Sequence, residues 1–376
     1  MKKIIITYAT AGIGHKKAAF AIRDALSAKK NSDIIIKIID ILEYSNAFFR
    51  KSYPTIYLLL INRLILLWGF FYYILDNRCI HNILFPIRRF LHIINCRRLI
   101  KFILNEKPDI IISTHFLTPD ICLYIKNKYK INISVVTVIT DYRAHSFWVS
   151  KGTDIYIVAD KVTARDLVEK WGISKDKIHA LGIPVEPKFA LTHDRNFFRK
   201  KFDISGDSLV LLLIGGGYGV GPMLGLLTDL EKRSLRLTVI TVCGHNKKLF
   251  SDIEKFKISA KFLKVTNFSY IENVDEVMAA SDLYIGKPGG ISITEAFTQD
   301  LPLVLIRPIP GQETRNARFI AENKIGVICK NLFEVSNTIE GFAKSKENLL
   351  EMKKNIERIK KPKAASAIAD FIINNA

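Results

Sequence analysis

Two polar segments combine groups that suit the binding of a sugar nucleotide. The first, Gly286–Glu295, contains a paired-glycine turn, the start of an expected helix and a carboxylate one turn further on. Glycines let the backbone approach a ligand, a helix start offers free N–H groups, and Glu295 suits a ribose. In the second, Ile309–Asn316, Gln312 and Glu313 bring an amide and a carboxylate to a Pro-Gly turn, which suits the hydroxyls of a hexose. Either segment alone is a common structural device, but the ordered pair indicates a nucleotide-sugar site.

A histidine lies at the start of a helix in the segment Thr10–Ala19, directly after the first expected strand. Gly12 and Gly14 permit the tight strand-to-helix turn, which places His15 in the first helical turn. Imidazole has a pKa suited to taking a proton from a hydroxyl, and the positive helix end favours its neutral form. We therefore interpret His15 as a candidate base. The alternative is a histidine that caps the helix or pairs with a phosphate.

The segment Thr140–Trp148 follows another expected strand and holds an aspartate, a histidine and a tryptophan. Asp141 could orient His15 or the acceptor hydroxyl, and Trp148 could lie against a lipid or sugar face. An inter-domain hydrogen-bond network explains the same residues equally well. The pairing of histidine and aspartate also suggests a metal, but no third ligand is spaced to join them, so no metal is expected.

A glycine-rich loop, Gly215–Pro222, follows a buried apolar run. Its amides can form a nest for a diphosphate, and the dipole of the following helix adds positive potential. A dinucleotide-binding loop is the competing interpretation, but it would need an acidic residue about twenty positions later. That region reads Leu235–Thr238, without the acid, and no Walker lysine-serine pair is present. We therefore expect a diphosphate contact without NAD, and no ATP hydrolysis.

Apolar strand-like runs alternate with helix-like periods, which predicts an α/β protein with parallel sheets and crossover helices. The first half contains the runs 4–8, 34–39, 110–113, 135–139 and 155–158. After a hydrophilic stretch, the second half contains the runs 209–214, 237–242, 264–268, 283–285, 303–306 and 326–329. Loops at the carboxyl ends of parallel strands bind ligands in such folds, and the candidate segments occupy such loops. The tail 344–376 is expected to form a solvated helix pair.

Length and composition indicate two cytoplasmic domains. With 376 residues and 49% hydrophobic residues, the chain can form two cores of roughly 180 residues each. The five cysteines lack Cys-x-x-Cys spacing, so neither a zinc site nor a disulfide framework is expected, and a reducing cytoplasm fits best. The opening Met1–Tyr8 is too short for a signal-peptide core and is interpreted as a buried strand, so export is not expected.

The formal charge of +20 requires an anionic partner: nucleic acid, an anionic membrane surface or acidic small molecules. Lysine-rich codon usage explains part of the total but not its distribution. Between Arg50 and Arg98 the basic residues face only Asp76 as an acid and lie among aliphatic and aromatic residues, as in a helix in a headgroup layer. The candidates for membrane or acceptor contact are Arg63, Trp68, Arg88, Arg89 and Trp148. The basic tail is not interpreted as a nucleic-acid patch.

The stretch 56–75 has about the length of a membrane span. Asn62 and Arg63 lie near its middle, where a charge is costly, and no second span follows to accommodate them. An interfacial or partly buried hairpin is therefore favoured over a span. Ordinary core helices of the first domain are the remaining alternative.

Several motifs identify a family: Gly-x-Gly-His, GGGYGVGPM, CGHNKKL, SYIENVDEVM, KPGGISITE and PGQETRN. Over nearly its whole length the chain resembles the monogalactosyldiacylglycerol synthases and processive diacylglycerol glucosyltransferases of bacteria and plastids. These are related to the glycosyltransferase that completes the lipid-linked peptidoglycan precursor. The resemblance implies a GT-B fold, with two Rossmann-like domains facing each other across a cleft. It implies an acceptor and membrane domain (1–190), a UDP-sugar domain (205–345) and C-terminal helices (346–376) that are candidates to pack back on the first domain.

The resemblance also assigns roles by motif, with His15 as the base. Asp141 is the second catalytic candidate, from its place after a strand. It matches Gly216–Val220 to a diphosphate loop and Ser269–Val274 to a uridine-binding segment. The full set of donor-binding residues is Gly14, Gly215, Gly216, Gly217, Tyr218, Gly219, Val220, Gly244, Asn246, Ser269, Tyr270, Asn273, Val274, Gly289, Gly290, Ser292, Glu295, Gln312, Glu313 and Asn316. Two positions depart from the family pattern. His245 stands where arginine is frequent and would weaken a charge contact, and Ser269 replaces a frequent glycine.

The expected reaction is an inverting transfer of glucose or galactose from a UDP-sugar to diacylglycerol or a related membrane lipid. No cofactor, metal or nucleic acid is expected, and the protein would be peripheral (monotopic) on the cytoplasmic face of the membrane. The rivals are N-acetylglucosamine transfer to a polyprenyl-linked precursor, a UDP-sugar epimerase and a non-catalytic UDP-sugar sensor. The presence of His15 argues against the sensor. Glucose and galactose stay open, because Gln312 and Glu313 could serve either.

Overall fold

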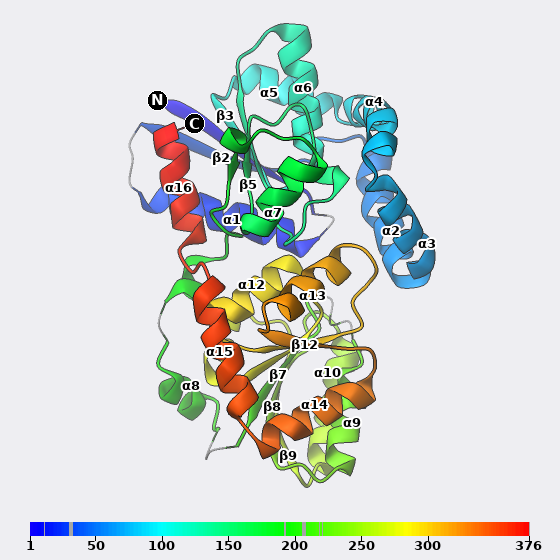
Figure 1. Ribbon diagram of the computed structural model, residues 1–376, viewed down its shortest axis with the longest axis vertical. Helices are drawn as coiled ribbons and strands as arrows, with labels where there is room; N and C mark the ends of the chain where they lie inside the picture. The colour runs from blue at the N-terminus through cyan, green and yellow to red at the C-terminus, as the bar shows by residue number, and fades with distance from the viewer. Residues whose placement is uncertain are drawn as a thin grey trace. The chain divides into compact units, whose positions relative to one another are not determined.

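The chain folds into two compact units, each built on a parallel six-stranded sheet (Figure 1). The computed structural model describes residues 1–10, 12–29, 33–191, 193–204, 208–217, 219 and 221–375. The first unit comprises Met1–Pro187, Ile309–Arg315 and Lys363–Ala376, and the second comprises Lys188–Pro308 and Asn316–Pro362. The first unit ends at Pro187, close to the expected domain boundary at 190. That the segment Ile309–Arg315 belongs to the first unit was not expected.

The sheet of the first unit has the strand order β2-β1-β3-β4-β5-β6. Its strands are β1 (Lys2–Tyr8), β2 (Ile34–Asp40), β3 (Ile110–Ser113), β4 (Ser134–Val138), β5 (Ile155–Ile157) and β6 (Ile178–His179). Parallel sheets are covered on both faces, so their strands are continuous apolar runs, which is why five of the six were recognisable in the sequence. The two-residue β6 is too short to leave such a run.

Helices cover both faces of this first sheet. They are α1 (Ile13–Ala28), α2 (Ala47–Arg63), α3 (Ile65–Leu75), α4 (Arg78–Asn95), α5 (Arg97–Glu106), α6 (Leu117–Tyr129), α7 (Lys161–Arg165) and α16 (Ala364–Asn375). Ile4 and Ile6 pack with α1 and α16 on one face, while Ile5 packs with α5 and α6 on the other. This alternation follows from the two-residue period of a strand.

The apolar stretch 56–75 is divided between two helices. Within the described part of the chain, no single helix is both long and apolar enough to cross a membrane. The segments Ala47–Ile61 and Ile65–Leu75 meet the length and composition criteria only as a pair, and they are bent by 107° relative to each other. The break lies at Leu64, whose backbone leaves the helical region.

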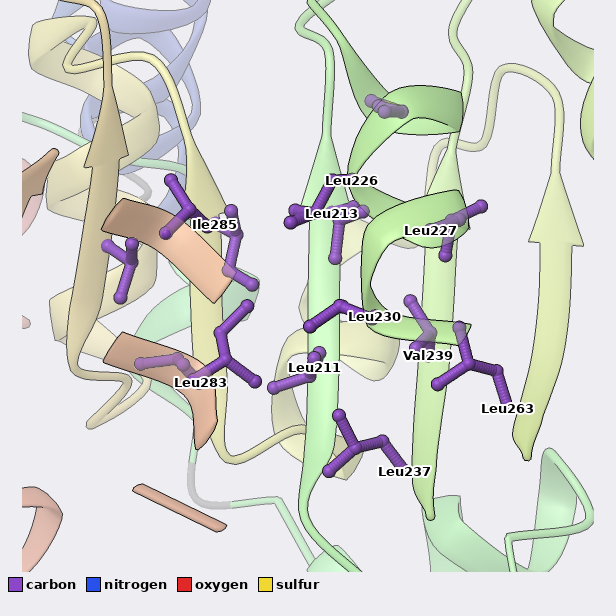
Figure 2. Close-up of a cluster of buried hydrophobic side chains, with 14 of the residues drawn as sticks. Leu211, Leu213, Leu226, Leu227, Leu230, Leu237, Val239, Leu263, Leu283 and Ile285 are labelled. Carbon is purple, nitrogen blue, oxygen red and sulfur yellow. The ribbon is translucent and has the colours of Figure 1, made fainter. Parts of the chain in front are cut away.

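The sheet of the second unit has the order β12-β11-β10-β7-β8-β9. Its strands are β7 (Val210–Ile214), β8 (Leu237–Val242), β9 (Leu263–Phe268), β10 (Leu283–Gly286), β11 (Leu303–Ile306) and β12 (Gly326–Cys329). Leu211 and Leu213 of β7 form the centre of its core, with leucines of α9 and residues of β10 around them (Figure 2). All six strands match expected runs. Strands β7, β8, β10 and β11 are largely buried, whereas β9 and β12 have partly exposed positions and lie at the edges of the sheet.

The helices of the second unit connect these strands, and α13 continues from the segment Ile309–Arg315. They are α8 (Arg195–Lys201), α9 (Met223–Lys232), α10 (Lys247–Ser259), α11 (Val274–Ala280), α12 (Gly290–Thr298), α13 (Gln312–Glu322), α14 (Leu332–Lys344) and α15 (Glu347–Ile359). The second unit therefore has the alternating strand and helix order of a doubly wound fold.

The C-terminal tail is not the solvated helix pair expected from its sequence. Helix α15 belongs to the second unit, where Lys360 just after it pairs with Asp300 at 2.7 Å. Helix α16 belongs to the first unit and buries Ile368 and Ile372 in the core beside α1. The expectation was wrong for α16 because its spaced apolar residues face a sheet rather than water.

The close packing of the loop before β5 on α6 yields a stability prediction. A Cβ atom at Gly152 would lie 2.0 Å from the carbonyl oxygen of Pro119 and 2.9 Å from Cβ of Leu123. Gly152→Ala should therefore lower the free energy of unfolding of the first unit by about 1–3 kcal/mol. Gly341→Ala in α14 is the matched control, since its Cβ would have nothing within 4 Å, and it should stabilise the second unit by about 0.5–1 kcal/mol. Urea unfolding checks both, and a parent-like curve for Gly152→Ala would contradict the packing.

Candidate active site

The strand order of the first sheet changes direction beside β1, which has β2 on one side and β3 on the other. In open α/β sheets, the loops at the carboxyl ends of such strands diverge and leave room for a ligand. His15 follows β1, Thr114 follows β3 and Asp141 follows β4. Three loops from this region of the sheet therefore bring the candidate base together with its neighbours.

The imidazole of His15 is held in one tautomer by a hydrogen bond. Its Nδ1 lies 2.6 Å from the carbonyl oxygen of Thr114, which can only accept, so Nδ1 carries the proton. Thr114 in turn donates its hydroxyl to the carbonyl of His15 at 2.9 Å, and its N–H to Thr7 at 3.0 Å. In the neutral ring the lone pair therefore lies on Nε2, as a base requires.

The environment of His15 keeps the ring neutral. Burial lowers the pKa of His15 below its ordinary value of 6.5, although the charge of Asp141 and the hydrogen bond to Thr114 act in the opposite direction. His115 lies edge-on to it with ring centroids 5.0 Å apart. Burial also lowers the pKa of His115 well below the ordinary range, and the neighbouring histidines lower it further. The group is thus two neutral imidazoles beside one carboxylate.

Trp148 links Asp141 to the histidine. Its Nε1 donates to Oδ2 of Asp141 at 3.2 Å, and its ring centroid lies 5.8 Å from that of His15. Trp148 is only 4% exposed, so it forms a wall beside the base rather than a contact with a membrane surface. The sequence predicts a membrane or acceptor contact for Trp148. Its burial is at odds with a contact at the membrane surface, while the contact with the acceptor stays a prediction.

Arg88 was expected as a cation at the membrane, and the structure contradicts this. Its guanidinium pairs with Asp120, a fully buried carboxylate, at 2.9 and 3.2 Å. It also donates to the carbonyl oxygens of Ser146, Phe147 and Val149. The planar group has five N–H donors, and here they converge on one acid and the turn that carries Trp148. Arg88 therefore organises the site from inside the unit.

The other membrane candidates lie on or beside an exposed apolar surface. Arg63 is exposed at the end of α2, Arg89 is partly exposed on α4, and Trp68 packs edge-on against Tyr57 with centroids 5.6 Å apart. We call the exposed apolar residues of these helices the α2–α4 apolar face: Phe48, Ile56, Leu58, Leu59, Leu64, Ile65, Leu66, Leu67, Phe70, Phe71, Ile74, Ile83, Leu84, Ile87, Phe90, Leu91 and Ile94. Exposed apolar surfaces of this kind mark interaction sites.

The segment Ile309–Arg315 carries the two expected hexose contacts, and it packs within the first unit. The amide of Gln312 donates to the hydroxyl of Tyr57 at 3.2 Å. The carboxylate of Glu313 accepts from the N–H of Ile309 at 2.9 Å. Both side chains had been assigned to the UDP-sugar domain, and that assignment is corrected by their contacts with α2 and within this segment.

In the second unit, the loop after β7 is built on glycine backbone that other residues cannot adopt. Gly216 and Gly219 have φ of 65° and 60°, and a Cβ at Gly219 would lie 1.9 Å from the carbonyl oxygen of Cys243. Gly215 and Gly217 complete the described part of the loop, while Tyr218 and Val220 lie outside the described residues. Such a turn leaves amides free to bind an anion.

A second glycine turn supports this loop. Gly244 has φ of 58°, and its Cβ would lie 2.5 Å from the carbonyl oxygen of Gly217. The N–H of His245 donates to that same oxygen at 3.0 Å. Asn246 donates its side-chain amide to the carbonyl of Gly219 at 3.0 Å and accepts from Leu249 at the start of α10. Asn246 therefore supports the loop from behind, which differs from its expected role as a direct donor contact.

The turn after β10 leads into α12, whose first N–H groups begin at Gly290. Gly289 precedes the helix in an extended conformation, and a Cβ there would have nothing within 4 Å. Ser292 is half-buried in the first turn, and Glu295 is buried one turn later. Asn316 is fully buried and donates its amide to the carbonyl of Pro288 at 3.1 Å. This bond holds the turn in place, and the expected contact of Asn316 with the donor stays a prediction.

The expected uridine segment follows β9 and contains an exposed aromatic pair. Tyr270 stacks on His245 with ring centroids 4.6 Å apart and planes within 7°. Ser269 lies outside the left-handed region of backbone conformation, so the serine fits without strain. Asn273 pairs with Glu276 at 3.2 Å, and Val274 begins α11. Histidine at position 245, where the family frequently has arginine, thus gives Tyr270 a stacking partner.

Several residues of the site were missed by reasoning from the sequence. Thr114 and His115 follow the run 110–113 directly, so the same strand-end rule that found His15 would have found them. Asp76 had been noted only as the single acid in a basic stretch, and Arg315 was not considered. In the described ranges no group of three histidine, cysteine or acidic residues is arranged to hold a metal ion.

Known proteins resemble the chain along most of its length. A family model described as monogalactosyldiacylglycerol (MGDG) synthase matches residues 15–185, and one described as glycosyltransferase family 28 C-terminal domain matches residues 222–370. The processive diacylglycerol beta-glucosyltransferase of Staphylococcus aureus (strain MRSA252) is 32% identical over 281 residues, which cover 74% of this chain and 70% of the relative.

Solved structures share the fold at lower identity. MurG of Acinetobacter baumannii has a TM-score of 0.63 at 17% identity, with 99% of each chain covered. UDP-GlcNAc 2-epimerase of Neisseria meningitidis, bound to UDP-GlcNAc, has a TM-score of 0.62 at 15% identity, with 99% of this chain and 100% of the other covered. These likenesses concern the fold alone and confirm the expected GT-B class with two Rossmann-like domains. On its sequence identity, the chain belongs to the diacylglycerol glycosyltransferase family of the processive diacylglycerol β-glucosyltransferases and monogalactosyldiacylglycerol synthases.

Proposed function

We propose that the protein transfers a hexose, glucose or galactose, from a UDP-sugar to diacylglycerol or a related membrane lipid, with inversion at the anomeric carbon. Membership of the family supports the substrate classes. The observation that carries the mechanism is the hydrogen bond from His15 to Thr114, because it leaves Nε2 available as a base. This combination favours transfer over a sensor without catalytic activity.

The first unit supplies the base in this proposal. As the acceptor hydroxyl attacks carbon one of the hexose, its proton passes to Nε2 of His15 while the bond to UDP breaks on the opposite face. The imidazolium that forms is stabilised by the carbonyl of Thr114 and the carboxylate of Asp141. Trp148 keeps Asp141 in place through its indole N–H.

The second unit holds the UDP in this proposal. The amides of Gly216 and Gly217 and the first turn of α12 would stabilise the charge that develops on the leaving diphosphate, without a metal or cofactor. The N–H groups of Gly215 and Gly219 instead donate to Val242 and Gly216. Tyr270 and His245 offer a stacked aromatic surface to the uracil ring. Glu295 keeps its proposed role toward the ribose. The segment Ser269–Val274 keeps its proposed role toward the uracil of UDP.

Replacement of the base tests the proposed transfer. His15→Ala should lower the rate of lipid glycosylation about 10²–10⁴-fold, the usual contribution of general base catalysis, while the affinity for UDP stays at the parental value. Labelled UDP-glucose and UDP-galactose are incubated with diacylglycerol vesicles and the lipids are extracted, and calorimetry measures UDP binding. Lys16→Ala, on the exposed neighbour in the same helical turn, is the control.

Full activity of His15→Ala would contradict the mechanism. The same incubation with UDP-N-acetylglucosamine distinguishes the rivals. Transfer of that sugar to a polyprenyl-linked acceptor, or an altered UDP-sugar with no labelled lipid, would replace the proposed hexosyltransferase by the corresponding enzyme.

The pH dependence of kcat/KM reports on His15. The neutral form is the base, so kcat/KM should fall as the pH falls through the pKa of His15, and burial places this acid limb below 6.5. The charge of Asp141 raises this pKa, so Asp141→Asn should move the acid limb to still lower pH. Asparagine removes the negative charge of Asp141 but can still accept the hydrogen bond from Trp148. A shift of the acid limb therefore reports on the charge and not on a lost contact. An acid limb that moves to higher pH in Asp141→Asn would contradict the assignment.

We propose that the α2–α4 apolar face places the protein peripherally on an anionic membrane, at the cytoplasmic face. Exposed cations border the helices at Arg50, Lys51, Arg63, Arg97 and Arg98, and anionic headgroups attract such residues. The cysteines are free thiols, which fits a reducing compartment. Neither a nucleic-acid partner nor a full membrane span is part of this proposal.

A charge placed in the α2–α4 apolar face should weaken membrane binding. Leu66 is 87% exposed, and Leu66→Glu should reduce partition into phosphatidylglycerol vesicles by about tenfold or more, since burial of a leucine contributes roughly 1.5–3 kcal/mol. Ile258→Glu is the matched control, because Ile258 is also 87% exposed but lies on α10 of the second unit. Vesicle flotation measures both, at low and high salt. If Leu66→Glu and Ile258→Glu bind the vesicles equally well, the α2–α4 apolar face is not the membrane contact.

A further inference from the structure

Helix α3 has two faces with different surroundings. Leu66 and Phe70 are 87% and 60% exposed and belong to the α2–α4 apolar face. Gly69 and Tyr72 are buried on the other side, and Asp76 caps the carboxyl end of the helix. The buried side contacts the segment Ile309–Arg315, so one helix connects the proposed membrane contact with the proposed hexose contacts.

Asp76 anchors this segment through an ion pair. Its side chain is 2% exposed and accepts from the guanidinium of Arg315, the ammonium of Lys170 and the N–H of Ser146. Burial raises the pKa of Asp76, but the nearby charges, with His145 and Arg315 foremost, outweigh it and hold the pKa below the ordinary value. Arg315 also donates to the carbonyl of Ala144 at 3.3 Å. A buried carboxylate with this many donors fixes its partners in one geometry.

The approach of the segment to α3 is so close that both sides need glycine. A Cβ at Gly69 would lie 2.8 Å from Cβ of Pro310. Gly311 has φ of +108°, and its Cβ would lie 2.9 Å from the ring of Tyr72. Either added methyl group would force the helix and the segment apart, because Cβ contacts under 3.0 Å are not tolerated.

These contacts hold both ends of the pair Gln312 and Glu313. Gly311 on one side packs against Tyr72, and Arg315 on the other side pairs with Asp76 and lies over the Tyr72 ring at 5.2 Å. Gln312 itself donates to Tyr57 of α2. The direction in which the amide and the carboxylate are presented therefore depends on α2 and α3, not on their own helix alone.

We infer that Asp76 and Arg315 are positioning residues for the donor hexose. Their ion pair holds Gln312 and Glu313 against helix α3, in the orientation that the sugar hydroxyls require. The inference rests on the proposed function, and it concerns the hexose rather than the UDP group. A brace that only stabilises the fold would affect UDP and UDP-hexose equally. A positioning pair affects UDP-hexose alone.

Calorimetry with UDP and with UDP-hexose separates these two roles. In Arg315→Gln the affinity for UDP-glucose or UDP-galactose should fall roughly fivefold or more, the range usual for coupled groups, while the affinity for UDP stays at the parental value. Arg318→Gln is the matched control, because Arg318 lies on the same helix α13 but is exposed and pairs with Glu322 instead of Asp76. It should change neither affinity.

Gly69→Ala tests the same geometry without removing a charge. Alanine in a helix interior is normally better than glycine, so this variant should fold, yet its methyl group displaces Pro310. It should reproduce the selective loss for UDP-hexose seen in Arg315→Gln. Equal loss for UDP and UDP-hexose, or no loss beyond that of Arg318→Gln, overturns the inference alone. A parent protein that binds no UDP overturns the proposed function as well.

Discussion

The hydrogen bond from Nδ1 of His15 to the carbonyl of Thr114 is the interaction on which the proposed chemistry depends. It joins residues that are 99 positions apart, at 2.6 Å, and it exists because β1 and β3 pair in parallel. Their carboxyl ends then lie at one edge of the sheet. The bond assigns the proton to Nδ1, and burial keeps the ring neutral. The pairing of two strands therefore leaves the lone pair on Nε2, which is the atom proposed to act as the base.

The charge of +20 is used in physically different ways. Arg88 and Arg315 satisfy buried carboxylates and backbone carbonyls, where they fix the turn of Trp148 and the segment Ile309–Arg315. Arg63 stays exposed beside the α2–α4 apolar face. Guanidinium groups suit both roles because they are less strongly hydrated than ammonium groups and donate in several directions. Net charge alone therefore overstates the cationic surface available to a membrane.

The candidate site of the second unit is built mainly from backbone groups, and that of the first unit from side chains. In the second unit, glycines at 216, 219 and 244 shape a loop whose amides are the proposed binding groups, and Asn246 and Asn316 hold the turns from behind. In the first unit, side chains act: an imidazole, a carboxylate and an indole in mutual contact. The glycine loops tolerate little substitution, because a Cβ would meet backbone atoms.

The sequence by itself determined every described strand except β6, the glycine turns, the position of His15 after β1 and the family. Each of these depends on neighbours close along the chain, such as a run of isoleucines or a glycine before a helix. Only the tertiary structure decided that Arg88 faces Asp120 and that Ile309–Arg315 packs on α3. It also decided between the two sequence-based expectations for α16, a solvated helix and a helix packed on the first unit, in favour of the second. The partners of these groups lie far away in the sequence. An arginine looks the same in a sequence whether the sheet order places water or a buried carboxylate beside it, so the identity of its partner is a property of the fold.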